Sequence, residues 1–290
     1  MPGLFDCLGD DHHHEKREGY LRSPLNYPGN KFSSLPNLLP LIPYDDSFVD
    51  VFGGTGQVLM ARKSSPLEVF NDRHAGIAAF FLCIQDAKLL EQLIERIRLL
   101  PHSREIFSYF KQTINEESDT LTRAVKWYYL VQSSFVGRAE YFGRITKRST
   151  PIFRKLYDNL ELFADIHERF TKVQVENLSW DMILKDYDSY KTVFYMDPPY
   201  INSNIYEHGM SPKDHHRMCS AIMNVKGFVA LSGYDNDIYD QYEWDHKYEW
   251  GLQNNVTTMA FSEGSVMEGR EDQASRTKVR KECLWIKETR

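Results

Sequence analysis

Hydrophobic positions along the chain fall into short runs that alternate with segments of helical spacing. Seven runs rich in β-branched or aromatic residues predict strands at Ser47–Phe52, Leu67–Asn71, Lys172–Glu176, Thr192–Met196, Gly227–Leu231, Val256–Phe261 and Glu282–Ile286. Between them, apolar residues recur with a helical period over Ile77–Ile84, Leu89–Leu99 and Leu121–Phe135. This alternation predicts a doubly wound α/β sheet, and the nearly continuous apolar early strands indicate parallel strands covered on both faces.

The stretch from Pro101 to Thr171 interrupts this alternation. It holds predicted helices and a basic, aromatic loop but no predicted strand. We therefore expect an inserted helical subdomain at 101–171, between 20–100 and 172–290, which together form the α/β domain. Residues 1–19 are polar and aperiodic, and predict a flexible tail. Its histidines, His12 to His14, lack the fixed geometry of a metal site, so we expect no functional metal there.

Composition places the chain among ordinary globular proteins. With 290 residues and 42% hydrophobic content it can bury a large core. The four cysteines, Cys7, Cys83, Cys219 and Cys283, form no C-x-x-C pair, which argues against a disulfide framework or a zinc ribbon. No apolar run approaches the roughly 20 residues that span a bilayer. We expect a cytoplasmic protein with no membrane partner.

The formal net charge of −6 hides one basic segment. From Arg138 to Lys155, six basic residues stand against the single acid Glu140, with aromatic residues interleaved. Such a segment suits the phosphate backbone of DNA, although a solvated helix face has the same composition. The candidate DNA-binding residues are Arg138, Arg144, Lys147, Arg148 and Arg154. A weaker basic cluster follows at Arg276, Lys278, Arg280 and Lys281.

A glycine-rich turn follows the first predicted strand. The run from Phe48 to Gly56 lets a ligand approach the backbone closely and presents it to a helix N-terminus. A purely structural turn or a dinucleotide site has the same appearance. Leu59 occupies the place of the third glycine of the dinucleotide fingerprint, so a nucleoside without pyrophosphate fits better. The candidate cofactor contacts in this run are Asp50, Phe52, Gly53, Gly54 and Gly56.

Two further motifs flank this turn along the chain. Asp72 ends the next predicted strand, where an acidic side chain can accept hydrogen bonds from two ribose hydroxyls or cap the following helix. Upstream, the turn from Tyr27 to Lys31 offers an aromatic ring and an ammonium group, which suit an adenosyl ligand and its amino-acid carboxylate. An ordinary Pro-Gly turn with a solvated lysine is the alternative for that turn.

The tetrapeptide Asp197-Pro198-Pro199-Tyr200 directly follows the apolar run at 193–196. Two prolines cannot continue a strand, so they end it at its carboxyl end, where open α/β sheets bind ligands. Asp197 can accept a hydrogen bond from an exocyclic amine, the carbonyl beside a proline can accept a second, and Tyr200 offers a ring for stacking on a base. The tetrapeptide therefore indicates chemistry on a planar amine.

The order of these motifs resembles the Dam-type family of adenine-specific DNA methyltransferases. Tyr-Pro-Gly-Asn-Lys, Asp-Val-Phe-Gly-Gly-Thr-Gly, Asn-Asp, a long insertion and Asp-Pro-Pro-Tyr follow one another, and the similarity extends to 231–236 and 280–286. The resemblance implies a Rossmann-like, mixed seven-stranded S-adenosylmethionine-dependent methyltransferase sheet with one antiparallel strand. It also implies that the insertion is the helical target-recognition subdomain.

The resemblance further implies the roles of the residues. Tyr27, Lys31, Asp72 and Asp197 would contact S-adenosylmethionine, whose product is S-adenosylhomocysteine, with no metal. Asp197 to Tyr200 would be catalytic, and the partner would be double-stranded DNA whose target adenine is flipped out of the helix. Tyr206, Glu207 and His208 lie where a loop could close over that base. The recognition sequence and the oligomeric state stay open, as do two alternatives: methylation of a cytosine amine in DNA or RNA, and a DNA-binding protein without activity.

Overall fold

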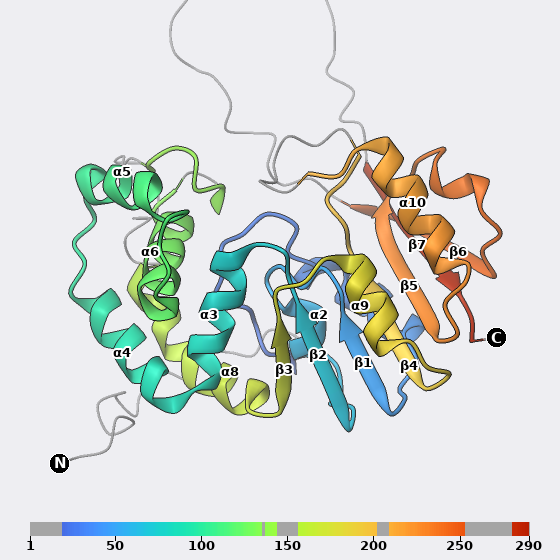
Figure 1. Cartoon of the computed structure of the whole chain (residues 1–290), viewed down its shortest axis with the longest axis horizontal. Helices are drawn as coiled ribbons and strands as arrows, with labels where there is room; N and C mark the ends of the chain where they lie inside the picture. The colour runs from blue at the N-terminus through green and yellow to red at the C-terminus, as the bar shows by residue number, and fades with distance from the viewer. Residues whose placement is uncertain (1–18, 135–136, 144–155, 202–208, 253–279, 290) are drawn as a thin grey trace, which may run out of the picture.

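The computed structural model describes residues 19–134, 137–143, 156–201, 209–252 and 280–289 (Figure 1). Its strands are β1 Ser47–Asp50, β2 Leu67–Asn71, β3 Val173–Glu176, β4 Thr192–Met196, β5 Phe228–Tyr234, β6 His246–Leu252 and β7 Arg280–Lys287. They form one seven-stranded sheet in the order β3-β2-β1-β4-β5-β7-β6. All pairs are parallel except those of β7, which runs antiparallel to both β5 and β6. The predicted mixed sheet with one antiparallel strand is confirmed.

Helices lie on both faces of this sheet (Figure 1). They are α1 Leu35–Leu38, α2 Gln57–Ala61, α3 Ala75–Gln85, α4 Ala87–Arg98, α5 Arg104–Thr113, α6 Thr120–Gln132, α8 Phe163–Phe170, α9 Trp180–Tyr187 and α10 Pro212–Ile222. Short 3-10 turns are η3 Phe32–Ser34, η4 Leu39–Leu41, η6 Asn159–Leu162 and η7 Tyr239–Gln241. None of the helices in these described ranges is long and apolar enough to cross a membrane.

Strand alternation divides the buried side chains into two clusters. In β4, for example, Val193 and Tyr195 belong to the cluster beneath α2, α3, α6 and α8, whereas Phe194 and Met196 belong to the cluster beneath α9 and α10. Because successive side chains of a strand point to opposite faces, residues of one strand with even numbers lie on one face of the sheet and those with odd numbers on the other. We refer to this as the parity of a residue. We call the two faces the α3 face and the α10 face.

The sequence placed most elements correctly, with differences at strand β6 and at the end of helix α6. Strand β6 at His246–Leu252 was not predicted, because its apolar residues Tyr248, Trp250 and Leu252 alternate with polar residues or glycine and form no continuous apolar run. The strand predicted at Val256–Phe261 lies outside the described residues. Helix α6 ends at Gln132, three residues earlier than predicted.

The described residues of the segment 101–171, which the sequence predicts to be an insertion, pack onto the α3 face. Helix α6 lies against α3, α4 and α5, and Trp127, Tyr128 and Tyr129 of α6 are all buried there. The insertion is also fastened to the segment before the first strand, because the Gln132 and Asn159 side-chain amides both donate to the Pro24 carbonyl at 2.6 Å. This fastening brings the insertion beside the carboxyl end of the sheet.

Asn71, at the end of β2, ties together the loops that follow β1 and β3. Its amide nitrogen donates to the Val51 and Leu178 carbonyls at 2.8 and 3.2 Å, and its oxygen accepts from the Leu178 N–H at 2.8 Å. The side chain is almost fully buried, at 1% exposure. It therefore satisfies backbone groups from two loops that line the same end of the sheet.

Replacing Asn71 with Ala should lower the free energy of unfolding by about 2 kcal/mol, because buried backbone groups lose their partners. Urea denaturation measures the change. Asn177→Ala is the matched control, since its amide donates to the Asp72 carbonyl from an exposed position, and it should cost less than about 1 kcal/mol. Equal losses of unfolding free energy in the two variants would show that the hydrogen bonds of Asn71 to the two loops do not stabilise the fold.

Candidate functional site

A cleft of about 490 Å³ opens at the carboxyl ends of β1, β2 and β4. This is the edge at which open α/β sheets bind ligands. It is lined by Tyr27, Pro28, Gly29, Lys31, Asp50, Val51, Phe52, Gly53, Gly54, Thr55, Gln57, Val58, Asn71, Asp72, Arg73, His74, Leu178, Ser179, Trp180, Tyr195, Asp197, Pro199, Gly209, Met210, Asp214 and Arg217. The lining therefore gathers all the segments that carry the sequence motifs upstream of the insertion, together with the tetrapeptide.

The glycine-rich turn forms the floor of this cleft. A Cβ atom at Gly53 would lie 2.2 Å from the Phe70 ring, so only glycine allows the turn to pass so close to β2. Gly56 is the N-cap of α2 and has a positive φ of 69°, a conformation that glycine adopts without strain. The turn therefore exposes backbone to a ligand at the start of a helix.

Asp72 fixes the rim of the cleft at the end of β2. Its two carboxylate oxygens accept from the Gly54 N–H at 2.8 Å and from the His74 N–H at 2.7 Å. The helix α3 that follows is capped by His74, whose ring nitrogen accepts from the Gly76 N–H. Asp72 thus links two neighbouring turns, and the N-cap role considered for it belongs to His74.

Asp197, the first residue after β4, is held on one side by hydroxyl groups. The Ser232 hydroxyl on β5 donates to Asp197 Oδ1 at 3.0 Å, and it lies 3.0 Å from the Tyr195 hydroxyl. Both hydroxyl side chains are buried. The orientation of the carboxylate is therefore set by groups from two adjacent strands.

On its other side Asp197 meets the ammonium of Lys31. Lys31 Nζ lies 2.5 Å from Asp197 Oδ2, 2.8 Å from the Tyr200 hydroxyl and 3.5 Å from Glu282 Oε1. Lys31 is only 5% exposed. Burial alone would lower its pKa, but the Asp197 and Glu282 carboxylates raise that pKa above its ordinary value, so the amine stays protonated.

Tyr200 completes this network. Its hydroxyl accepts from Lys31 and donates to Glu282 Oε1 at 3.3 Å, and its ring centroid lies 4.2 Å from that of Tyr234. Tyr200 is therefore fixed at both its ring and its hydroxyl. We call the group Lys31, Asp197, Tyr200 and Glu282 the lysine network.

Asp50, at the end of β1, carries a buried carboxylate on the wall of the cleft. It is 1% exposed, and its Oδ1 has no hydrogen-bond partner within the described part of the chain. Burial, followed by repulsion from Asp197 and Asp72, raises its pKa well above the usual value. A buried acidic oxygen without a partner is suited to receive a cationic or hydrogen-bonding group of a ligand.

Most of the site residues predicted from the sequence come together in this cleft. Those that line it are Tyr27, Lys31, Asp50, Phe52, Gly53, Gly54, Asp72, Asp197 and Pro199. Gly56 lies behind the lining at the start of α2, and Pro198 and Tyr200 adjoin it through the tetrapeptide.

Of the predicted DNA-binding residues, the structure describes only Arg138. Arg138 is exposed, and Gly137 beside it packs against the backbone of Asn26, next to the cleft residue Tyr27. The other four, Arg144, Lys147, Arg148 and Arg154, lie outside the described residues, as do Tyr206, Glu207 and His208 of the predicted closing loop.

Several site residues were not identified from the sequence. Ser232 and Tyr195 are polar positions inside otherwise apolar strand runs, and Glu282 directly precedes such a run; this pattern was the available signal. Trp180 and Arg217 line the cleft from α9 and α10, with the guanidinium carbon 5.2 Å from the indole ring centroid. Nothing local in the sequence connects these two residues, because only the fold brings α9 and α10 together.

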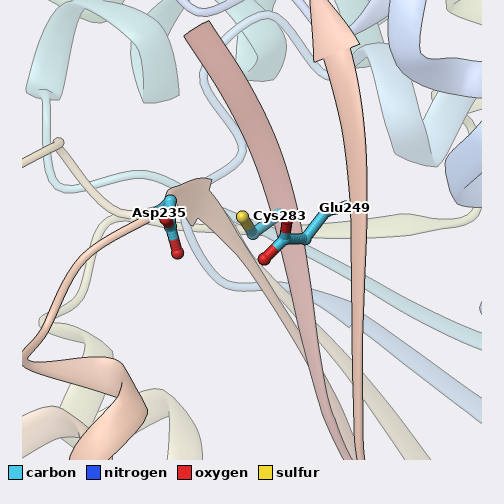
Figure 2. Close-up of side chains that lie close together, drawn as sticks. All are labelled: Asp235, Glu249 and Cys283. Atoms are coloured by element: carbon cyan, nitrogen blue, oxygen red, sulfur yellow. The ribbon is translucent and has the colours of Figure 1, made fainter.

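Away from the cleft, Asp235, Glu249 and Cys283 place one potential metal-ligand atom each within 4.8 Å of one another (Figure 2). Lys247 Nζ, however, lies 2.8 Å from Asp235 and 3.5 Å from Glu249, and so supplies the positive charge that a cation would bring. Burial raises the pKa of the Cys283 thiol to about 12, which keeps it protonated and a poor ligand. The cluster is an ion-pair network.

The chain matches one family model and is similar to several known proteins. A family model described as D12 class N6 adenine-specific DNA methyltransferase matches residues 27–261. The chain is 29% identical over 192 residues to modification methylase LlaI of Lactococcus lactis subsp. lactis, and 28% identical over 196 residues to modification methylase StsI of Streptococcus sanguinis. It is 26% identical over 265 residues to Type II methyltransferase M.FokI of Planomicrobium okeanokoites.

These matches cover different shares of the proteins compared. They include 62%, 63% and 80% of this chain, respectively. The same alignments include 30%, 29% and 39% of the relatives, so the chain spans about a third of their length.

Removing the ammonium of the lysine network should destabilise the fold in a pH-dependent way. Lys31→Met leaves buried carboxylates without their cation and should cost about 3 kcal/mol at neutral pH. Burial already raises the Glu282 pKa, and Lys31 opposes that rise, so the pKa is higher still in the variant. The folded variant then binds protons more readily than the unfolded chain, and the penalty should shrink as pH falls.

Urea denaturation between pH 5 and 8 measures this difference against the wild type. Lys191→Met is the control, because Lys191 pairs with Asp46 at an exposed position and its loss should change little at any pH. A Lys31→Met penalty that stays constant, or grows at low pH, would contradict the interpretation.

Proposed function

Because the chain belongs to the D12 class N6 adenine-specific DNA methyltransferase family, we propose that it transfers a methyl group from S-adenosylmethionine to the exocyclic 6-amino group of adenine in double-stranded DNA. The observation that carries this proposal is the position of Asp197. Its carboxylate is held by Ser232 and Lys31 at the carboxyl end of β4, on the wall of the cleft. An acceptor fixed in this way can orient an amine beside a bound methyl donor.

The cleft fits S-adenosylmethionine in size and in chemistry. A volume of about 490 Å³ lies within the range of pockets for ligands of this size. We assign the methionine ammonium to Asp50, whose buried Oδ1 lacks a partner, and the ribose hydroxyls to Asp72, because a carboxylate can accept about four hydrogen bonds. Tyr27 and the turn at Gly53 and Gly54 enclose the ligand between them. Once bound, the sulfonium supplies an activated methyl group.

The residues after β4 then act on the amine that receives the methyl group. The amine of adenine is a poor nucleophile because its lone pair is delocalised into the ring. Hydrogen bonds from the amine to Asp197 and to the Pro198 carbonyl favour a pyramidal nitrogen and direct the lone pair toward the methyl carbon. As the nitrogen gains positive charge, the Asp197 carboxylate stabilises it and is positioned to receive the departing proton.

An adenine stacked in a duplex cannot reach Asp197, so the base must first leave the helix. Tyr200 lies three residues beyond Asp197, and its ring and hydroxyl are both fixed. A ring that does not have to be ordered on binding loses little entropy when a base packs against it. We assign Tyr200 to stacking on the flipped adenine.

We assign the grip on the phosphate backbone to the insertion. Arg138 is exposed beside the Asn26–Tyr27 backbone, so the basic segment starts next to the cleft. Tyr141 is 75% exposed, and the Lys111 ammonium of α5 lies 5.9 Å from its ring centroid. Cations and aromatic rings together suit DNA near a flipped base. We extend the same role to Arg144, Lys147, Arg148 and Arg154 from their sequence alone.

Asp197→Ala should lower the rate of methyl transfer by at least about a hundredfold, because the amine loses its principal acceptor. Long-read sequencing of DNA from cells that express the wild-type chain gives the methylated sequence. Transfer of labelled methyl groups to a duplex with that sequence gives the rate. The affinity for the duplex should change less than threefold.

Asp235→Asn is the matched control, because Asp235 is an exposed acid that pairs with Lys247 outside the cleft. It should transfer methyl groups like the wild type. Wild-type protein that methylates cytosine, or no base at all, would disprove the proposed function, and full activity of Asp197→Ala would disprove the role of Asp197.

Binding of S-adenosylmethionine should release a proton from Asp50. The raised pKa of the free Asp50 carboxyl favours its protonated form, whereas a ligand ammonium favours the ionised form and lowers that pKa. Affinity should therefore increase as pH rises toward the pKa of the free protein. Calorimetry in buffers of different ionisation enthalpy counts the protons released.

Two comparisons isolate the ammonium in this experiment. S-adenosylhomocysteine should release the same proton, while 5′-methylthioadenosine, which lacks the amino-acid group, should release none. Asp50→Asn should remove the proton release for every ligand. Equal proton release with 5′-methylthioadenosine would show that Asp50 does not receive the ammonium.

A further inference from the structure

Glu282 is a buried acid in strand β7, next to apolar positions of the same face. Leu284 and Ile286, two and four residues further along, belong to the cluster of the α3 face, and Glu282 shares their parity. Its exposure is 1%. A carboxylate is costly to bury unless it is paired, so the partners of Glu282 indicate what it does.

The partners of Glu282 are Lys31, which pairs with Asp197, and Tyr200, which belongs to the same tetrapeptide as Asp197. Glu282 Oε1 lies 3.5 Å from Lys31 Nζ and accepts a hydrogen bond from the Tyr200 hydroxyl at 3.3 Å. Lys31 in turn donates to Tyr200 and to Asp197 Oδ2. An ionised carboxylate accepts hydrogen bonds and donates none. Glu282 therefore fixes the direction of two hydrogen bonds, the one from Lys31 to Tyr200 and the one from Tyr200 to Glu282 itself.

The same arrangement sets the charge beside Asp197. Without Glu282, the Lys31 ammonium would be matched by the Asp197 carboxylate alone. With Glu282, one ammonium is shared between two carboxylates, which leaves an excess of negative charge where the proposed reaction makes a nitrogen positive. Burial raises the pKa of Glu282, and the Lys31 ammonium opposes that rise and so favours the ionised form of this acid.

We propose that Glu282 is a positioning residue for methyl transfer, which acts through Lys31 and Tyr200 and does not touch the substrate. It holds the Tyr200 ring and the Asp197 carboxylate in a fixed relative position. It also pairs with the Lys31 ammonium, so that Asp197 stays a strong hydrogen-bond acceptor for the amine. This inference rests on the proposed function, and it adds a residue from the last strand to a site otherwise built from Lys31 and the tetrapeptide.

Glu282→Gln, which keeps the shape and removes the charge, tests the proposal. Its single-turnover rate of methyl transfer, at saturating S-adenosylmethionine and duplex, should fall about ten- to a hundredfold, as for a small misplacement of reacting groups. Affinities for S-adenosylmethionine and for a duplex with 2-aminopurine at the target position, measured without turnover, should stay within threefold of wild type. Glu282→Asp, which keeps the charge, should recover part of the rate.

A double-mutant cycle with Lys31→Gln shows whether Glu282 acts through Lys31. In the Lys31→Gln background, Glu282→Gln should cause no further loss of rate, because the ammonium that it positions is gone. Glu249→Gln is the matched control on the neighbouring strand β6. Glu249 pairs with Lys281 and Lys247 outside the network, and its loss should leave the rate unchanged.

Three results would overturn the inference: a Glu282→Gln rate within threefold of wild type, a loss confined to the two affinities, or a loss that persists in full in the Lys31→Gln background. If Glu282→Gln does not fold, Glu282→Asp replaces it, and an unchanged single-turnover rate in that variant has the same meaning. Wild-type protein without methyl transfer would instead contradict the proposed function, so the two failures are distinct.

Discussion

One buried ammonium, that of Lys31, links the parts of the candidate site to one another. It lies between carboxylates from two different segments, after β4 and on β7, and it donates to the tyrosine that ends the tetrapeptide. Burial penalises each charge by itself, and only their proximity offsets the penalty. The packing around Asp197 therefore depends on charges that compensate one another, so that the removal of one leaves its partners less well balanced.

Sequence periodicity predicted most of the fold because its strands obey simple rules. The runs at 67–71 and 192–196 match β2 and β4 residue for residue, since central parallel strands are apolar on both faces. Strand β6 was missed because an edge strand has one partner and keeps polar residues such as Lys247 and Glu249. The alternation of Tyr248 and Trp250 with these charged residues was the available local signal.

The candidate site likewise contains residues that local sequence patterns predicted and residues that they did not. Gly53, Asp72 and Asp197 were found because each follows a predicted strand, and the carboxyl ends of parallel strands meet at one edge. Ser232 and Glu282 could not be assigned, because their meaning comes from neighbours far away in the chain. A polar residue in an apolar run shows that a partner exists, but the sheet order decides which partner it is.

Strand β7 has a consequence beyond the geometry of the cleft. It is inserted between β5 and β6 and is antiparallel to both, so Glu282 reaches Lys31 only while this part of the sheet is closed. Local opening of the sheet near its β6 edge takes less free energy than global unfolding, and each such opening would withdraw the acid from the network. The population of molecules with an intact lysine network therefore follows the free energy of this local opening, which amide exchange in β7 reports.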